Sequence, residues 1–126
     1  MSKTAITSPE LAPPVGPFSQ AVKIDGLLFF SGQVAQDPAT GKVVEGGIVA
    51  ETERVFRNLS AVLKAAGKSF EHVARAGVYL TNLSDFGAMN GIYAKHFSQP
   101  FPACTTIGVA ALPLGACVEI DLVVKA

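Results

Sequence analysis

Two acidic residues lie within a stretch that otherwise has the composition of a buried strand. Residues 117–124 read Cys-Val-Glu-Ile-Asp-Leu-Val-Val, and strict alternation places Glu119 and Asp121 on one face with Cys117 and Val123. A carboxylate held in a cleft can act as a general acid or base on a bound water. Two carboxylates on a solvated or interfacial face are the commoner arrangement, and the pattern alone favours it. Glu119 is a candidate catalytic residue on this basis.

Cys104 and Thr106 share one face of another predicted strand, residues 103–110. A thiol becomes a nucleophile when a neighbouring base or positive charge stabilises the thiolate, and no recognisable motif places a histidine beside Cys104. A buried structural cysteine is the commoner outcome. We expect no disulfide with Cys117, because pairing of the last two strands through their turn leaves the cysteines several residues apart. A disulfide needs Cα atoms within about 7 Å.

The remaining reactive side chains form no recognisable constellation. His72 and His96 lack the partners of a metal site or a triad, and we expect each at the surface or a helix end. The glycine-containing segments match neither a phosphate loop nor a dinucleotide fingerprint. Arg75 lies within a predicted strand, where it could bind an anion if it faces a cleft, and a solvated or salt-bridged arginine is the alternative. No metal site is predicted.

Composition indicates one soluble domain that forms an oligomer. The chain has 126 residues, 49% of them hydrophobic and 16% charged, and such a surplus of apolar surface is most simply buried between subunits. Ten basic residues balance ten acidic ones and lie singly along the chain, which argues against a nucleic-acid partner. The first ten residues lack the apolar core of a signal peptide, and no run is long enough to span a membrane. We expect a cytoplasmic protein with no membrane contact.

The first half of the chain predicts strands followed by a long helix. A proline-rich lead-in over residues 8–17 precedes strands over 20–25 and 27–33, which Asp25-Gly26 joins as a hairpin. Residues 42–45 could form a further short strand. A helix then follows, with an apolar stripe at Ile48, Val55, Phe56, Leu59, Val62, Leu63 and Ala66, and Glu51 and Asn58 off that stripe. Gly67 ends it.

The second half alternates between strands and a second helix. Residues 73–81 are predicted to form a strand, and Ser84 or Asp85 can cap a helix with a stripe at Phe86, Met89, Tyr93 and Phe97. Residues 103–110 and 117–125 are predicted strands joined by a turn. The order predicts a single α+β domain over residues 1–126, with two helices on one face of a mixed or antiparallel sheet. The other face should be apolar and uncovered.

Several of these segments together resemble the RidA/YjgF family of reactive enamine and imine deaminases. Singly the motifs are weak, but their shared order and spacing cover almost the whole chain. They are Gly16-Pro17-Phe18-Ser19-Gln20-Ala21, Ser31-Gly32-Gln33, Asp37-Pro38 with Gly41, Asn58-Leu59 to Ala65-Ala66-Gly67, Leu83 to Tyr93, Phe101-Pro102-Ala103 and Val118-Glu119-Ile120-Asp121.

The resemblance implies a chorismate-mutase-like βββαβαββ fold assembled as a trimeric barrel. Small-molecule sites would then lie in clefts between subunits, and no cofactor would be required. The residues that match the family's site are Phe18, Ser31, Gly32, Asn90, Thr106 and Glu119. In the family, the glutamate activates a water that attacks the imine carbon, releasing ammonia and a 2-keto acid.

One position departs from the family pattern. Where the deaminases carry an arginine that grips the substrate carboxylate, this chain carries Cys104, and Phe18 replaces the usual tyrosine. A cysteine cannot supply a fork of charged donors. The expectation is a deaminase-like hydrolase with altered substrate recognition, or alternatively a non-catalytic ligand-binding or protein-interaction trimer. A ribonuclease or translation inhibitor, and a hydrolase with Cys104 as nucleophile, rank lower.

Overall fold

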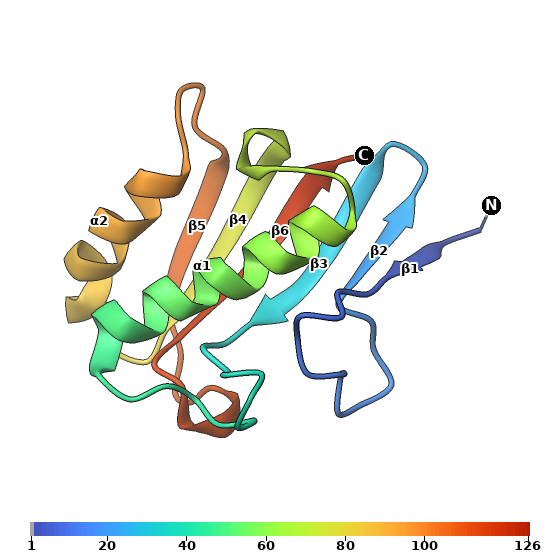
Figure 1. The fold of residues 1–126 in the computed structure, drawn as a ribbon. Coiled ribbons are helices and arrows are strands. Elements are labelled where there is room, and N and C mark those ends of the chain that lie inside the picture. Colours follow the sequence, from blue (N-terminus) through green and yellow to red (C-terminus); the bar gives the residue numbers. More distant parts are fainter. Residues whose placement is uncertain (1) are drawn as a thin grey trace.

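A six-stranded mixed sheet carries two helices on one of its faces (Figure 1). The computed structural model describes residues 2–126, and the strands lie in the order β1-β2-β3-β6-β4-β5. The elements are β1 (Thr4–Ile6), β2 (Ala21–Ile24), β3 (Leu27–Gln33), α1 (Gly47–Ala65), β4 (Val73–Leu80), α2 (Phe86–His96), β5 (Ala103–Gly108) and β6 (Val118–Lys125), with short 3-10 turns at Phe70–His72, Leu83–Asp85 and Pro113–Gly115. The predicted α+β class is confirmed.

One of the first three strands comes from a different segment than the sequence suggested. The hairpin of β2 and β3 is confirmed, and Asp25 in its turn has a φ of 50°. The predicted strand over residues 42–45 is wrong, because this segment makes only an isolated bridge between Gln36 and Val43. The additional strand is β1, near the start of the chain, and it pairs antiparallel with β2 at the edge of the sheet. Its three residues are mostly exposed, so no hydrophobic pattern marks them.

Helix α1 is confirmed, but two of its polar residues point inward. Gly67 follows the helix with a φ of 70°, as a C-terminal glycine should. Glu51 and Asn58, which the sequence placed off the apolar stripe, are both buried. Glu51 accepts a hydrogen bond from the Cys117 backbone N–H at 2.9 Å, and Asn58 donates to backbone carbonyls of the segment that follows β3. Each polar side chain is inward because it satisfies a backbone group of a neighbouring loop.

Asp85, one of the two predicted caps, occupies the N-cap position of helix α2, although its side chain makes no capping hydrogen bond within residues 2–126. The 3-10 turn that precedes the helix has its own cap, because the Asn82 side chain accepts a hydrogen bond from the Ser84 backbone N–H at 3.0 Å. Met89, Tyr93 and Phe97 are buried as predicted, together with Ile92. Phe86 is 44% exposed and does not belong to the buried stripe. The buried stripe therefore begins at Met89, one turn into the helix.

The last two strands do not form the expected hairpin. β5 pairs parallel with β4, and β6 pairs antiparallel with both β3 and β4, so β4 separates β5 from β6. The helix α2 provides the crossover that a parallel β4–β5 pair requires. Cys104 and Cys117 are both free thiols, as predicted.

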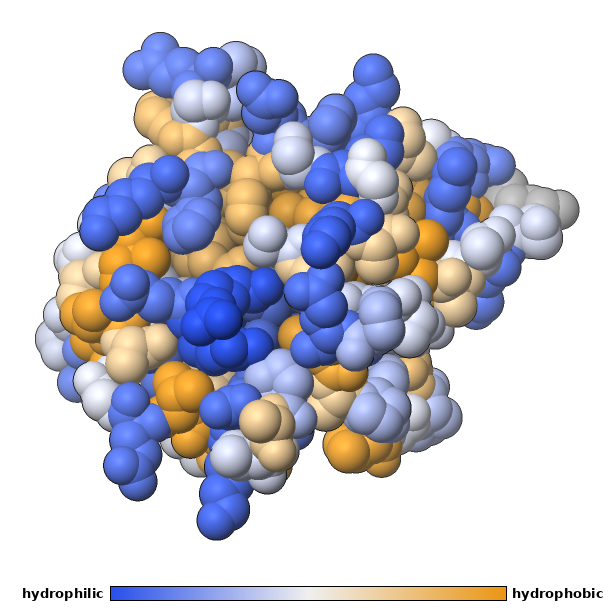
Figure 2. Space-filling model, in the orientation of Figure 1, coloured by the Kyte–Doolittle hydropathy of each residue, from blue (hydrophilic) through white to orange (hydrophobic). Residues whose placement is uncertain are grey.

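The two faces of the sheet have different environments. Alternate residues of the central strands, such as Val78, Ile120 and Leu122, pack beneath the helices and form the core. On the opposite face no helix covers Phe29 and Ile107, which are 41% and 45% exposed. Figure 2 shows the helix-bearing face, where hydrophilic residues are interspersed with apolar ones. The predicted uncovered apolar face is therefore present, although its centre carries polar side chains.

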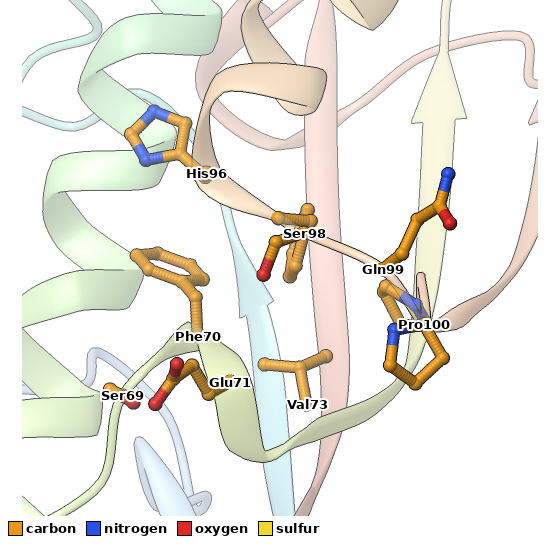
Figure 3. A pocket seen from close by; sticks show the side chains of 10 residues that line it. Ser69, Phe70, Glu71, Val73, His96, Ser98, Gln99 and Pro100 are labelled. Atoms are coloured by element: carbon orange, nitrogen blue, oxygen red, sulfur yellow. The ribbon is translucent and has the colours of Figure 1, made fainter.

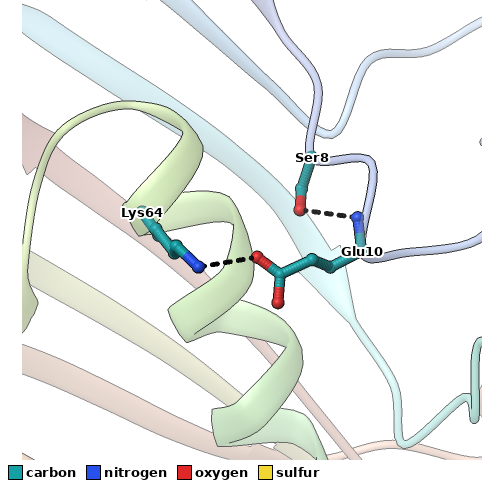
Figure 4. A network of polar contacts seen from close by, with 3 residues as sticks. All are labelled: Ser8, Glu10 and Lys64. Carbon is teal, nitrogen blue, oxygen red and sulfur yellow. Dashed lines mark hydrogen bonds and ion pairs between the residues drawn. The ribbon is translucent and has the colours of Figure 1, made fainter.

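The N-terminal segment is held against this layer by polar contacts (Figure 4). The Ser8 backbone N–H donates to Gln20 Oε1 at 2.6 Å, and Ser8 Oγ accepts from the Glu10 N–H at 3.2 Å. Glu10 forms an ion pair with Lys64 of α1 at 3.3 Å. Both side chains of that pair are largely exposed, so it contributes little to stability. The hydrogen bond from Ser8 to the buried Gln20 holds the start of the proline-rich lead-in against β2.

Candidate functional site

A cleft of about 550 Å³ opens between the N-terminal lead-in, the end of β3 and the start of β6. Its walls combine an apolar segment with a few polar side chains, the composition of a small-molecule site. Its lining includes Leu11 to Val15, Phe18, Gln20, Ser31 to Val34, Asn58, Pro113, Leu114 and Glu119. Four of the predicted site residues, namely Phe18, Ser31, Gly32 and Glu119, meet here.

The Glu119 carboxylate lies against the backbone of Gly32. β3 has an irregularity in its pairing with β6 between Phe30 and Gln33, which brings Gly32 beside Glu119. A Cβ at position 32 would collide with Glu119 Oε2 and lie 2.8 Å from its Cδ. Burial raises the pKa of Glu119, and the charge of Asp121 raises it further. Glu119 is thus a half-buried carboxylate with increased proton affinity, as a general base near neutral pH requires.

Ser31 and Gln20 hold the rim of the cleft. The Ser31 hydroxyl donates to the Ser19 carbonyl at 2.6 Å, and the Ser31 N–H donates to the Gln20 carbonyl at 3.0 Å. These two bonds tie the lead-in to β3 and thereby place the Phe18 ring in the wall. Gln20 is buried, and its Nε2 has no hydrogen-bond partner among residues 2–126. The hydroxyl of Ser31 is thus engaged with the Ser19 carbonyl.

Most of the other lining residues were not identified from sequence, among them Gln20, Asn58 and Leu114. Gln20 and Asn58 lie within motifs that carried the family resemblance, and their position in those motifs was the only available signal. Leu114 has a φ of 60° and is exposed, which turns its side chain to the cleft in a way that no periodicity indicates. Turn residues of this kind escape pattern analysis because local backbone geometry decides their direction.

Cys104, Thr106 and Asn90 lie apart from this cleft. In the register of the sheet, Thr106 pairs with Val78, which faces the helices, whereas Glu119 pairs with Tyr79, which faces the opposite side. Cys104 and Thr106 therefore lie on the helix-bearing side of the edge strand β5, as side chains alternate along a strand. Asn90 is exposed on α2 and does not line the cleft. The predicted site residues form two groups on opposite faces of one protomer.

The second group is a small cluster of uncharged polar and thiol-bearing residue types, centred on Cys104 and Thr106. Cys104 Sγ lies 3.8 Å from Thr106 Oγ1, and Cys104 is exposed. Tyr93 of α2 is buried, and its hydroxyl has no hydrogen-bond partner among residues 2–126. Burial and the neighbouring Cys104 thiol raise the pKa of Tyr93, so the phenol is neutral. No positively charged side chain belongs to this cluster of three.

Arg75 does not join either group through an ion pair. It lies on the uncovered face of β4, directly beside Val123 of β6, and is exposed. Of its two predicted interpretations, the solvated arginine is the one that agrees with the structure.

A second hollow, of about 510 Å³, lies where α2 ends (Figure 3). The His96 ring stacks on Phe56 with ring centroids 4.2 Å apart and contacts Phe70 at 5.3 Å. Burial lowers the pKa of His96, and nearby Lys95 lowers it further. His96 is thus a packed helix-end histidine, as predicted. His72 accepts a hydrogen bond from the Ser69 N–H at 3.1 Å through Nδ1, which closes a turn at the surface.

Within residues 2–126, no group of three or more histidine, cysteine or acidic side chains is arranged to hold a metal ion. The helices described in the structure are also too short or too polar to cross a membrane.

Known proteins resemble this chain over nearly its whole length. The profile of the family described as Endoribonuclease L-PSP matches residues 9–126. Protein DfrA of Myxococcus xanthus is 46% identical over 125 residues, which cover 98% of this chain and 95% of that protein. A 2-iminobutanoate/2-iminopropanoate deaminase of Capra hircus is 44% identical over 109 residues, covering 86% of this chain and 80% of that protein.

The fold comparison agrees with the sequence comparison. The crystal structure of RidA from the Antarctic bacterium Psychrobacter sp. PAMC 21119 superposes with a TM-score of 0.92 at 39% identity, covering 98% of this chain and 99% of that one. The likeness thus extends over the sheet, both helices and the segments that form the cleft. The chain belongs to the RidA/YjgF family, whose members share the L-PSP profile.

Proposed function

We propose that the protein is a hydrolytic deaminase of reactive imines and enamines, with Glu119 as the residue that binds and activates water. The observation that carries this proposal is the position of the Glu119 carboxylate over Gly32, half-buried in a cleft and with a raised pKa. Relatives named 2-iminobutanoate/2-iminopropanoate deaminase support the reaction class, at 44% identity in Capra hircus and 41% in Homo sapiens.

The reaction needs only a base, a water and an electrophilic carbon. An enamine first becomes its imine by gaining a proton at carbon and losing one from nitrogen. Glu119 then takes a proton from water as the oxygen attacks the imine carbon, and it returns this proton to the imine nitrogen. In the resulting carbinolamine, the hydroxyl proton passes to the amine nitrogen as the carbon–nitrogen bond breaks, which leaves ammonia and a carbonyl product. No electron transfer occurs.

The two groups of candidate residues support a site shared between subunits. Cys104 and Thr106 lie on the opposite face of the sheet from Glu119, so one chain cannot bring them to the same substrate. A homotrimer in which the β5 edge of one subunit closes the Glu119 cleft of its neighbour would unite them. The uncovered apolar residues Phe29 and Ile107 supply surface for such packing.

Cys104 determines the substrate preference in this proposal. The family resemblance assigns its position to the contact with the substrate carboxylate, and the Cys104–Thr106–Tyr93 cluster contains no lysine, arginine or histidine side chain. Losing a charge-assisted pair costs about 1.5–3 kcal/mol, or roughly one to two decades of affinity. We therefore expect imines without a carboxylate to compete well with amino-acid-derived imines.

Ammonia release tests the reaction, with imines generated in the assay from amino acids and from simple amines. We expect the protein to accelerate hydrolysis and Glu119→Gln to lose about 10²-fold or more. RNA incubated at low and high salt serves as the control substrate. A folded protein that accelerates hydrolysis of none of these imines would overturn the proposal.

Mixed oligomers test the shared site. Glu119→Gln and Cys104→Trp each inactivate a different half, so both pure variants should be inactive. Co-refolded at equal amounts, about a quarter of the sites would combine two intact halves, and activity should return to that level. If oligomers shown to be mixed recovered no activity, Glu119 and Cys104 would not form a site shared between subunits.

A non-catalytic ligand-binding trimer is the second candidate, and the observation that favours it is the presence of Cys104 where the family pattern has an arginine. In that case Glu119→Ala should leave binding of a neutral carbonyl or amide ligand unchanged, while the imine assay shows no turnover. Loss of that binding in Glu119→Ala, together with imine turnover by the unmodified protein, would argue against the second candidate.

A further inference from the structure

The two carboxylates of β6 point away from each other across the uncovered face of the sheet. Glu119 lies over Gly32 on the β3 side, whereas Asp121 lies over Gly77 on the β4 side. A Cβ at position 77 would collide with Asp121 Oδ1 and lie 3.0 Å from the Tyr79 hydroxyl oxygen. Because glycine has no side chain, each carboxylate can occupy the space beside a glycine of the neighbouring strand.

The hydroxyl of Tyr79 serves Asp121 and not Glu119. Tyr79 lies directly opposite Glu119 in the register of β4 and β6, yet its hydroxyl reaches diagonally and donates to Asp121 Oδ2 at 2.9 Å. Among residues 2–126 the structure shows no hydrogen bond to the Glu119 carboxylate. The nearest phenol is therefore engaged elsewhere, and the Glu119 oxygens remain available to a water or a substrate.

We propose that Tyr79 and Asp121 form a positioning pair for Glu119: Tyr79 holds the Asp121 carboxylate over Gly77, and the negative charge of Asp121 directs the Glu119 carboxylate to the other side, toward Gly32. This inference rests on the proposed function, because it assigns a role in the activation of water by Glu119. Neither Tyr79 nor Asp121 lines the cleft, so neither is expected to touch the substrate.

The charges around Glu119 agree with this role. Asp121 is the charged group that raises the pKa of Glu119 in addition to burial. From β4, Tyr79 is held neutral, because the hydrogen bond to Asp121 raises the pKa of the phenol, and Arg75 opposes that effect at the far end of the strand. The other walls present uncharged residues, namely Ser31, Gly32 and Gln33 from β3 and Phe18 and Leu114 from the loops.

Asp121→Asn separates the charge from the hydrogen bond. The amide oxygen can still accept from Tyr79, but the negative charge is gone, so Glu119 should become a weaker base. We expect the acidic limb of the kcat/KM profile to move to lower pH, with KM nearly unchanged. Asp25→Asn is the matched control, because Asp25 lies in the exposed β2–β3 turn, and it should leave the profile unchanged.

Tyr79→Phe removes the hydrogen bond and keeps the charge. Asp121 is then free to turn from Gly77, so kcat should fall several-fold. Because both substitutions act through one pair, their effects should not add in the double variant. If the effects of the two substitutions on kcat simply added, and neither single variant moved the acidic limb of the kcat/KM profile, Tyr79 and Asp121 would not act as a positioning pair.

Direct titration keeps this inference separate from the reaction itself. Carboxyl-carbon NMR of the intact oligomer reports the ionisation of Glu119, whose signal Glu119→Gln identifies. Asp121→Asn should move that titration to lower pH whether or not an imine is hydrolysed. An unmoved Glu119 titration would refute the inference and leave the deaminase standing, whereas full activity of Glu119→Gln would refute the deaminase and leave the titration result intact.

Discussion

The carboxylate of Glu119 fills the space directly beside the Cα of Gly32, where any larger residue would place its β-carbon. The irregular pairing of β3 with β6 at this point is what brings the two residues together. A carboxylate that rests on bare backbone can lie inside the cleft without a side-chain partner to neutralise it. This relationship is the basis of the first prediction.

Gly32→Ala should displace Glu119 and reduce imine hydrolysis by about tenfold or more, because small misplacement of a reacting group is costly. Steady-state ammonia release, with circular dichroism to confirm folding, measures this. Gly26→Ala is the matched control, since a Cβ at Gly26 meets nothing within 4 Å. Equal activity of both variants would contradict the assigned position of Glu119.

Cys104→Arg should improve the hydrolysis of carboxylate-bearing imines by about one to two decades in KM, because the guanidinium can pair with the carboxylate. Imines without a carboxylate should not benefit. Cys104→Ser, which keeps a small neutral side chain, is the control. A Cys104→Arg variant with an unchanged preference between the two imine classes would show that position 104 does not contact the carboxylate.

Glu119→Gln should stabilise the fold at neutral pH. Burial and Asp121 raise the pKa of Glu119. Its protonated form is therefore favoured in the folded state, and that contribution is lost as the pH rises through the folded-state pKa. The neutral amide avoids this loss, so its melting temperature should exceed that of the wild type at pH 7, with the difference disappearing near pH 4. Glu119 is half-exposed, so the gain should stay below about 1 kcal/mol. A less stable variant at pH 7 would contradict the direction of the shift.

Asn58→Ala should destabilise the protein by about 2–3 kcal/mol, because it leaves two carbonyls without their buried donor. Asn58 Nδ2 donates to the Val34 carbonyl at 3.1 Å and to the Gln36 carbonyl at 3.0 Å. Chemical denaturation measures the change in the free energy of unfolding. Asn90→Ala, on the exposed side of α2, should change it by less than about 0.5 kcal/mol. Similar values for the two variants would show that the Asn58 bonds are dispensable.

The two cysteines should differ in reactivity. Burial, together with the Glu51 side chain, raises the pKa of Cys117 to about 12, so its thiolate is scarce at neutral pH. An alkylating reagent at pH 7 should therefore modify Cys104, which is exposed, and leave Cys117 unmodified, as peptide mass spectrometry can show. Alkylated protein that still hydrolyses small imines would exclude Cys104 as a nucleophile.

Much of the layer could be predicted from local patterns. The 3.6-residue stripe of α1, the glycine after its end and the Asp25-Gly26 hairpin each depend on neighbouring residues, and each is confirmed. The alternation of β6 correctly placed Glu119 and Asp121 on one face. These features are local because a helix face or strand face is set by residues two to four positions apart.

The predictions that failed concern contacts between distant segments. The β5–β6 hairpin was wrong because β4, more than twenty residues earlier, inserts between the two strands. β1 was missed because its partner β2, and not its own composition, makes it a strand. Glu51 and Asn58 were misplaced because their buried partners belong to remote loops.

The sequence by itself determined the family, the α+β class and the residue types available for chemistry, since these reside in motif order and local periodicity. Only the tertiary structure decided which of those residues meet. The insertion of β4 puts Cys104 and Glu119 on opposite faces of the sheet, and the irregularity in β3 puts Glu119 over Gly32. Strand order and register arise from pairing across the whole chain, so no local pattern could have shown this division.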